Sequence, residues 1–214
     1  MKILLFICGL LLSMSLFQMT ALAQELPDFR NDRESFKRLS DKGLRADLST
    51  FTLAGVEESI GRNPLKKIAP ENYTKQQLFF NGKDLTVTLT VGPFDKKGKK
   101  LLAMEDRLVK INNKPYYGNY GDTPVTEIKR FEVIMEGDTV AIPPAAYADL
   151  FNVYFAFIDG SGKVRTSSGL FFSVDGKRLY IYLQNRDRTG SYEVTWIIDN
   201  KKYLRRVLDY GMIQ

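Results

Sequence analysis

The last third of the chain carries the clearest alternation of apolar and polar positions. In one segment Leu179, Ile181 and Leu183 alternate with two tyrosines, and in the next, tyrosine, valine, tryptophan and isoleucine recur at every second position. A period of two places such residues on one face of a β-strand. Turn sequences rich in Asp, Asn and Gly separate the segments. The pattern predicts four linked strands, at residues 170–174, 178–184, 191–198 and 202–208.

Shorter alternating segments upstream predict further strands. They lie at residues 48–56, 78–80, 85–91, 101–104, 107–111, 127–135, 139–142 and 152–158. Asn81-Gly82 favours a tight hairpin turn, because both residues readily adopt positive φ angles. Helix is expected at only two places. The first is a short surface helix over Arg33 to Ser40, with a loosely packed arm as the alternative, and the second is a short helix over Ala145 to Phe151.

About a dozen short strands with little helix predict an all-β fold, a β-sandwich of immunoglobulin-like or jelly-roll-like type. All 8 prolines lie at or before Pro144. Because proline cannot donate to a sheet ladder, the segment after Pro144 suits continuous central strands. No linker-like tract divides the chain. We therefore expect a single sandwich domain over 48–214, preceded by an arm or short helix over 24–47.

One short segment resembles a known structural feature. Asp187-Arg-Thr-Gly190-Ser-Tyr192-Glu-Val194 is similar to the tyrosine corner of immunoglobulin-like sandwiches, with one extra residue between the aspartate and the glycine. Val194 stands where antibody domains keep a cysteine. The resemblance implies that the Tyr192 hydroxyl bonds back to upstream backbone. It supports a sandwich and implies no function.

Residues 1–23 have the pattern of a signal peptide rather than of part of the fold. Lys2 supplies the charged start, residues 3–17 the apolar centre, and Ala21-Leu22-Ala23 a small-residue cleavage site before Gln24. Two serines and a glutamine interrupt the apolar run, which argues against a retained membrane span. We expect a periplasmic or secreted protein with no transmembrane span in the mature chain.

Composition narrows the possible chemistry. The chain has no histidine, and its single cysteine, Cys8, lies in the predicted signal peptide. The commonest general base and the usual zinc ligands are therefore missing, and we expect no metal site and no cofactor. Removal of Lys2 lowers the formal net charge from +6 to +5, a surplus spread over many turns. Such a distribution does not favour a nucleic-acid groove.

Paired carboxylates are the one catalytic arrangement left open, because glycoside hydrolysis needs only two acids at a fixed separation. Glu57-Glu58 and Glu105-Asp106 are adjacent acids. Neighbouring residues on a strand point to opposite faces, so neither pair is preformed by the sequence. Asp159-Gly-Ser-Gly162 is compatible with a calcium loop, but Lys163 stands where a ligand is needed, and a hairpin turn explains the segment.

Residues 112–124 form the longest stretch without a strand or helix pattern. They carry Tyr116, Tyr117 and Tyr120 among glycine and proline. Aromatic rings with polar tips on a loop suit stacking against a sugar or contact with a protein partner, so these three residues are the predicted ligand-binding site. In the alternative interpretation the tyrosines fold back and cover the end of the sandwich.

A second group of aromatic residues lies in the final strands. Tyr180, Tyr182, Tyr203 and Arg205 form either an outer binding face or a half-covered second face of the sheet. Trp196 shares its face with three other apolar or aromatic residues, and we expect it in the core.

These observations predict an exported, non-catalytic binding or accessory protein of the cell envelope, with a glycan or another envelope protein as its partner. The first alternative is a carboxylate-only glycoside hydrolase, which requires two acids facing each other in a cleft. The second is a structural component of an envelope complex, which requires a flat apolar patch.

Overall fold

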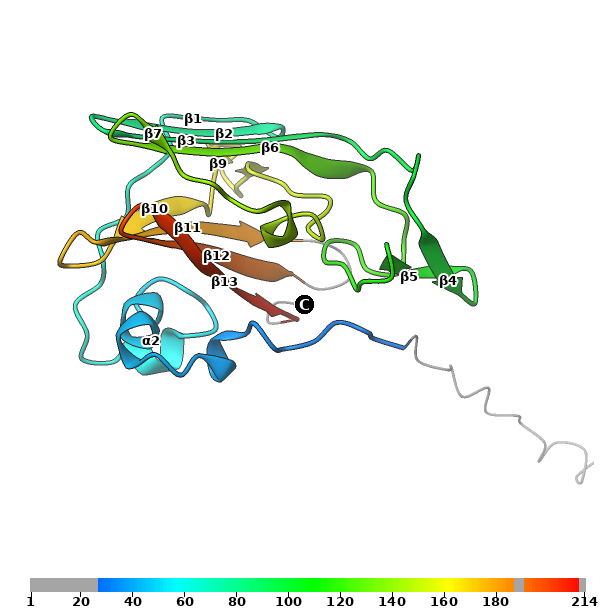
Figure 1. The fold of residues 1–214 in the computed structure, drawn as a ribbon, viewed down its shortest axis with the longest axis horizontal. Helices are drawn as coiled ribbons and strands as arrows, with labels where there is room; N and C mark the ends of the chain where they lie inside the picture. Colours follow the sequence, from blue (N-terminus) through cyan, green and yellow to red (C-terminus); the bar gives the residue numbers. More distant parts are fainter. Residues whose placement is uncertain (1–26, 187–190, 212–214) are drawn as a thin grey trace, which may run out of the picture.

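The computed structural model describes residues 27–186 and 191–211, and the predicted signal peptide lies outside them. Of the described residues, 43% lie in strands and 9% in helices, and the sheets are antiparallel, which confirms the predicted all-β class. Figure 1 shows the two larger sheets as stacked layers.

The first layer is a five-stranded sheet of order β1-β2-β3-β6-β7. Its strands are β1 (Asn72–Tyr73), β2 (Gln77–Gly82), β3 (Leu85–Pro93), β6 (Thr126–Met135) and β7 (Asp138–Thr139). The second layer is a four-stranded sheet that follows chain order. Its strands are β10 (Gly169–Phe172), β11 (Arg178–Asn185), β12 (Tyr192–Asp199) and β13 (Lys202–Tyr210). Two separate hairpins pair β4 (Leu101–Met104) with β5 (Arg107–Ile111), and β8 (Phe157–Ile158) with β9 (Val164–Arg165).

The four strands predicted at the end of the chain are confirmed within two residues at each boundary. The hairpin of β2 and β3 also forms, but its turn lies at Lys83-Asp84, because β2 continues until Gly82 pairs with Leu85. The strands predicted at 139–142 and 152–158 are each reduced to two residues.

The helix predicted over Ala145 to Phe151 is wrong beyond its start. A single 3-10 turn, η3, covers Pro144–Ala146. The chain beyond η3 pairs with a distant loop instead of continuing a helix. Tyr117 donates its N–H to the Asp149 carbonyl, and Phe151 donates its N–H to the Tyr117 carbonyl, both at 2.9 Å.

One apolar cluster combines residues from both large sheets. Val87 and Leu89 of β3 and Ile181 of β11 belong to it, as does Trp196 of β12, and each has at most 1% of its surface exposed. The Trp196 ring packs edge-on against Phe131 of β6, with ring centroids 4.7 Å apart. The prediction that Trp196 is a core residue is confirmed.

The opposite face of the four-stranded sheet is also apolar, and an N-terminal segment covers it. This segment, called here the N-terminal cap (residues 36–59), contains η1 (Phe36–Arg38), α2 (Lys42–Leu48) and η2 (Val56–Ser59). A second cluster joins cap and sheet. Its buried members are Phe36, Leu39, Leu44, Leu48, Phe171, Tyr180, Tyr182, Ile197 and Val207. In Figure 1, α2 lies on the side of this sheet away from the five-stranded one.

The cap overturns the prediction of a first strand at 48–56. Asp41 caps α2 by accepting the Leu44 N–H at 2.9 Å, and Leu44 and Leu48, four residues apart, share the buried face. Beyond Leu48 the hydroxyl of Thr52 donates to the Leu48 carbonyl at 2.9 Å and stabilises a turn. The helix predicted over Arg33 to Ser40 exists only as η1, and the α-helix begins after it.

Two carboxylates of the sheet hold the cap in place. Glu193 and Asp209 are directly opposite each other on β12 and β13. Glu193, 2% exposed, accepts the N–H groups of Leu53 and Ala54 at 2.9 and 2.8 Å. Asp209 accepts the Phe36 N–H with both oxygens. Burial raises the pKa of Glu193, and burial, reinforced by the neighbouring Glu193 charge, raises the pKa of Asp209 from 3.8 to about 6.

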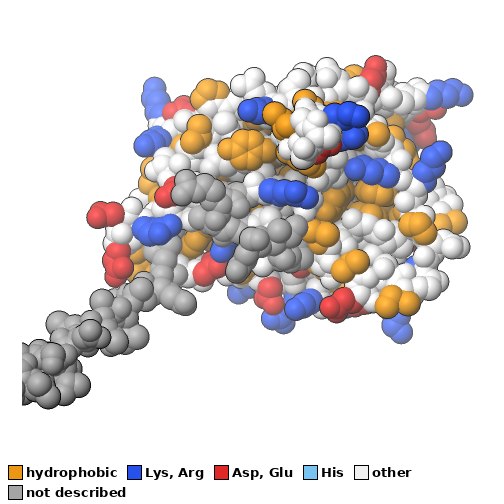
Figure 2. Space-filling view, turned by 180° about the vertical axis from the view of Figure 1, so that it is seen from behind, with side chains coloured by type: hydrophobic (Ala, Val, Ile, Leu, Met, Phe, Trp, Pro, Cys, Tyr) orange, Lys and Arg blue, Asp and Glu red, His pale blue; other side chains and the backbone are white. Residues whose placement is uncertain are grey.

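The surface that faces away from the viewer in Figure 1 is chemically mixed. Figure 2 shows lysine and arginine side chains there interspersed with acidic and hydrophobic ones. No helix within residues 27–186 and 191–211 is long and apolar enough to cross a membrane.

The raised pKa of Asp209 predicts a protein that is more stable at mildly acidic pH. Between its unfolded pKa of 3.8 and its folded pKa of about 6, Asp209 binds more protons in the folded than in the unfolded state. The free energy of unfolding therefore falls as pH rises through this window. We expect thermal unfolding to show a higher Tm at about pH 5 than at about pH 7, with a shift of roughly 2–4 °C for each kcal/mol.

The Asp209→Asn variant should lose much of this pH dependence, because its amide does not titrate. Asp138→Asn is the matched control, since the Asp138 side chain is 81% exposed. Equal pH dependence in wild type and Asp209→Asn would contradict the assignment to Asp209.

Candidate functional site

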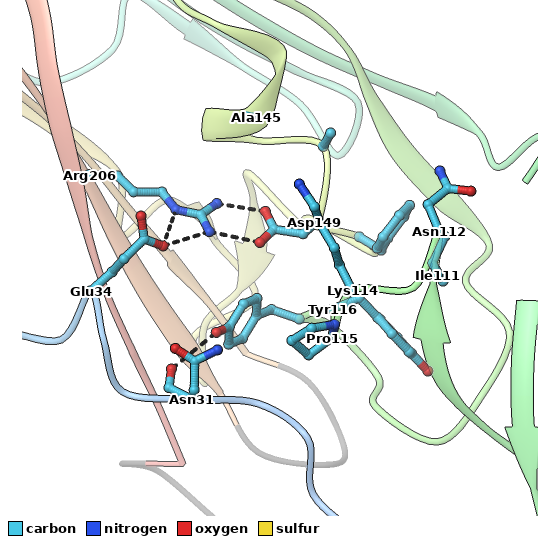
Figure 3. A pocket seen from close by; sticks show the side chains of 13 residues that line it. Asn31, Glu34, Ile111, Asn112, Lys114, Pro115, Tyr116, Ala145, Asp149 and Arg206 are labelled. Carbon is cyan, nitrogen blue, oxygen red and sulfur yellow. Dashed lines mark hydrogen bonds and ion pairs between the residues drawn. The ribbon is translucent and has the colours of Figure 1, made fainter. Parts of the chain in front are cut away.

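A cavity of about 440 Å³ lies where four parts of the chain meet. We call it the Arg206 pocket (Figure 3). Its lining residues are Asn31, Glu34, Ile111, Asn112, Lys114, Pro115, Tyr116, Tyr117, Ala145, Ala148, Asp149, Phe151 and Arg206. They come from the N-terminal arm (residues 27–35), the end of β5 and the loop after it, the turn around η3, and β13.

Arg206 reaches the pocket because of its place on β13. It pairs with Trp196 across β12 and β13, so both side chains lie on the face of the sheet that Trp196 buries in the core. The next residue, Val207, belongs to the cluster under the cap, on the other face. A register shift between Ile197 and Ile198 sets this alternation. Arg206 is therefore a cation that is only 6% exposed, and it must be paired.

Asp149 supplies the deeper partner of Arg206. Its Oδ1 and Oδ2 accept from Nη1 and Nη2 at 2.6 and 2.7 Å, an arrangement in which each oxygen meets one nitrogen. Nη1 also donates to the Ala146 carbonyl at 3.1 Å, and the Trp196 indole N–H donates to the same carbonyl at 2.8 Å. The turn around η3 is thereby tied to both the arginine and the core tryptophan.

Glu34, from the N-terminal arm, covers the other edge of the guanidinium. Its Oε2 accepts from Nε at 2.8 Å and lies 2.8 Å from Nη2. Its backbone carbonyl accepts the Leu208 N–H at 2.9 Å. These carboxylates hold the guanidinium in its charged form, and the pKa of Arg206 is raised by Asp149 and Glu34 although burial opposes this.

The three predicted site tyrosines lie in and beside the pocket, and all three are buried. Tyr116, Tyr117 and Tyr120 are 0, 4 and 5% exposed. Tyr116 and Tyr117 line the pocket wall, and Tyr120 does not. Burial raises the pKa of both Tyr116 and Tyr117 to about 12, so their hydroxyls stay neutral. This burial agrees with the alternative interpretation, in which the rings fold back onto the protein. A role of these tyrosines in ligand binding stays a prediction.

The tyrosine hydroxyls have structural partners. Tyr116 donates to the Asp122 carbonyl at 2.7 Å and accepts the Gly121 N–H at 3.0 Å, which closes its own loop. Tyr117 donates to the Asn31 carbonyl at 3.3 Å, and Tyr120 donates to the Pro27 carbonyl at 2.9 Å. The loop thereby holds the N-terminal arm that carries Glu34.

Gly118 allows the loop to pass close to the turn after η3. Its φ angle is +96°, and a Cβ atom there would lie 1.9 Å from the Phe151 carbonyl oxygen. Only glycine meets both conditions, because any side chain would collide with the backbone.

Lys114 and the small residues complete the pocket. Lys114 is exposed, and Figure 3 shows its amine extending toward the side that Asp149 borders. It forms no ion pair with any residue that the structure describes. Two carboxylates and two cations therefore line the cavity together with the short side chains of Pro115, Ala145 and Ala148. The pocket therefore presents both hydrogen-bond donors and hydrogen-bond acceptors to a ligand within about 440 Å³.

The second predicted aromatic group does not form one surface. Tyr180 and Tyr182 are buried under the N-terminal cap, where their hydroxyls donate to Asp47 and, at 2.7 Å, to Glu193. Tyr203 lies on the opposite face of the four-stranded sheet, where it packs against the cluster between the two sheets. Arg205 is partly buried. Both interpretations of the sequence leave Tyr180 and Tyr182 at least partly exposed, whereas the structure buries them.

The adjacent acids do not face each other across a cleft. Glu105 and Asp106 form the exposed turn between β4 and β5, with φ angles of +48° and +62°. Glu58 is paired with Arg45, and Glu57 is exposed.

Asp159 is likewise occupied within its turn. It accepts the Lys163 N–H at 3.0 Å and pairs with Arg165 at 2.9 Å. Within the described part of the chain, no group of three or more Asp, Glu, His or Cys side chains is placed so that it could hold a metal ion. In the tyrosine-corner segment, residues 187–190 lie outside the described ranges, while Tyr192 and Val194 are buried.

Arg206 is the site residue that sequence reasoning missed. Leu204, Arg206 and Leu208 alternate with Tyr203, Arg205 and Val207, so each face of β13 carries one arginine. Periodicity alone does not say which arginine points inward, and the register shift decides it. Glu34 and Asp149 carried no signal, because their proximity arises only from tertiary folding.

Comparison of the chain with protein-family models, with curated proteins and with solved structures finds no match.

The buried tyrosines predict a loss of stability on truncation. Changing Tyr116, Tyr117 and Tyr120 together to alanine should lower the free energy of unfolding by about 3 kcal/mol or more. The change leaves cavities and removes the hydrogen bonds through which the tyrosine hydroxyls hold the arm. Trp196→Ala, expected to cost about 3–5 kcal/mol, gives the scale for a core ring. Urea unfolding measures both variants. A triple variant as stable as wild type would show that the rings are not part of the core.

Proposed function

We propose that this is an exported, non-catalytic binding protein of the cell envelope, and that the Arg206 pocket receives a polar segment of a peptide or protein partner. The observation that carries the proposal is a cavity of about 440 Å³ lined by charged groups of both signs, with Arg206 of β13 bonded to Asp149 and Glu34. Concave sites with a few well-placed polar groups are the usual form of a binding site.

A peptide is favoured over a glycan by the state of the aromatic rings. Sugar recognition uses open ring faces. Tyr116 and Tyr117 are at most 4% exposed. Phe151, the remaining ring of the lining, is 1% exposed. A peptide segment instead needs hydrogen-bond donors, acceptors and room for its backbone, which Lys114, the carboxylates and the small alanines offer.

The carboxylates of the pocket also explain why binding is proposed rather than hydrolysis. Glu34 and Asp149 both contact the Arg206 guanidinium. A glycosidase needs one carboxylic acid that is protonated and free to donate to the leaving group. Both carboxylates already accept hydrogen bonds from Arg206, so neither is free to serve a leaving group.

We also propose that the two stacked sheets form a β-sandwich. The five-stranded sheet comes from residues 72–139 and the four-stranded sheet from residues 169–210, so each is built from one continuous part of the chain. Greek-key sandwiches, immunoglobulin-like and jelly-roll-like types among them, connect strands in a different order. The proposal is therefore limited to a sandwich.

The binding proposal predicts that filling the pocket weakens partner capture. Ala145 is exposed and lines the cavity, so Ala145→Trp should occupy the space without disturbing the core. Capture of a partner from the native envelope fraction should fall about tenfold, the effect of about 1.4 kcal/mol. Ala103→Trp, at an exposed alanine of β4 outside the pocket, is the matched control and should capture normally. Equal capture by both variants would rule out the pocket as the binding site.

Export predicts a processed chain. Intact-mass measurement of the native protein should show the loss of residues 1–23, with Gln24 as the new N-terminus, because Ala21-Leu22-Ala23 offers a small-residue cleavage site. Recovery of the full-length chain in the membrane fraction would contradict this prediction.

A further inference from the structure

We propose that the Arg206 pocket recognises a carboxylate group, and that Glu34 holds the place of that carboxylate on Arg206 until the ligand displaces it. This inference rests on the proposed binding function of the same pocket.

The two edges of the Arg206 guanidinium are satisfied unequally. Asp149 binds one edge with two oxygens, each bonded to its own nitrogen at 2.6 and 2.7 Å. Glu34 covers the edge formed by Nε and Nη2 with Oε2 alone, at 2.8 Å from each nitrogen. A carboxylate binds this edge best when each oxygen meets one N–H group. A ligand carboxylate can adopt that geometry and improve on Glu34.

The two carboxylates also differ in how easily they can leave. The Asp149 side chain is 21% exposed, whereas that of Glu34 is 46% exposed. Glu34 can therefore turn into water, where its charge is solvated, while Arg206 keeps its paired contact with Asp149. Its backbone carbonyl can keep the bond to the Leu208 N–H during this movement. The exchange requires rotation of one side chain and no displacement of the arm.

Lys114 provides a second attraction for an incoming anion. With Glu34 turned away, the charged groups that face the cavity are Arg206, Lys114 and Asp149, which sum to one positive charge. One ligand carboxylate restores neutrality. Lys114 is exposed and not ion-paired within the described residues, so its ammonium can reach the ligand without breaking another contact.

Because Glu34 is tethered to the same chain, it competes at a high effective concentration. The apparent affinity for the ligand is reduced by the fraction of molecules in which Arg206 is open. Removing the Glu34 charge should therefore strengthen binding of a carboxylate. A purely structural role for Glu34 predicts no such gain.

Three tripeptide probes test the inference by calorimetric titration of the purified protein. They are acetyl-Ala-Ala-Ala with a free C-terminal carboxylate, its C-terminal amide, and acetyl-Ala-Asp-Ala amide. Fluorescence of Trp196, the single tryptophan, gives a second readout, because its indole and Arg206 share the Ala146 carbonyl. Wild type should bind at least one carboxylate probe more tightly than the plain amide. Preference for the free C-terminus or for the aspartate probe identifies which source of carboxylate the pocket accepts, and either supports the proposal.

Glu34→Gln should bind the preferred carboxylate probe about tenfold more tightly, as expected when a state populated at about 10% becomes dominant. Glu57→Gln removes the same charge from an exposed position of the cap and should leave affinity unchanged. Lys114→Met should weaken binding about two- to fivefold. The Tm of each variant verifies folding.

Equal affinity for acid and amide probes, or no gain in Glu34→Gln, would overturn the carboxylate inference. Failure of this kind is distinct from failure of the binding function. If Ala145→Trp still lowers partner capture about tenfold while the acid and amide probes bind alike, the pocket binds its partner through another group.

Discussion

The four-stranded sheet is apolar on both faces, and this requires two separate covers. Along β12, seven of the eight residues are buried, from Tyr192 through Ile198. The five-stranded sheet covers one face of the four-stranded sheet. Because the second face is also apolar, another segment of the chain must cover it. The N-terminal cap is that element, and Figure 1 shows it across the sheet from the other layer. The position of the cap determines where the arm, and therefore Glu34, must lie.

Covering a sheet with a short helical segment leaves polar backbone at the contact, and the protein satisfies it with charged side chains. Glu193 and Asp209 accept three backbone N–H groups of the cap. The arrangement buries two neighbouring carboxylates, which is unfavourable for their charged forms. That cost appears as their raised pKa values. Arg206, on the other face of β13, is compensated by Asp149 and Glu34. Each buried charge thus ties a distant segment to the sheet.

The local sequence patterns predict where the strands lie, but they do not predict which segments pack on each strand. Alternation located the final four strands, because period two is a property of neighbouring residues. Tyr180 and Tyr182 were expected to be half-covered at most, since a tyrosine in a strand does not reveal what packs on it. The segment after Leu48 has β-favouring residues, yet Thr52 bonds back to the helix carbonyl and makes a turn. The candidate tyrosines were found by sequence, whereas Arg206, Glu34 and Asp149 depend on a register shift and on contacts over more than 50 residues.

The arm that carries Glu34 covers the edge of β13 with its backbone and contacts Arg206 with the Glu34 side chain. β13 is an edge strand, and edge strands expose backbone groups that invite pairing with other chains. The arm covers part of this edge through the bond between the Leu208 N–H and the Glu34 carbonyl. Tyr117 holds the arm on one side of Glu34, at Asn31, and Asp209 holds the start of the cap on the other side, at Phe36. Because the backbone is held at both flanks, the Glu34 side chain can exchange with a ligand while the edge stays covered. A binding site that opened by release of the whole arm would expose the edge of β13 each time a ligand entered. An exchange confined to one side chain avoids that exposure, which is why we place ligand recognition at the guanidinium of Arg206 and not in movement of the arm.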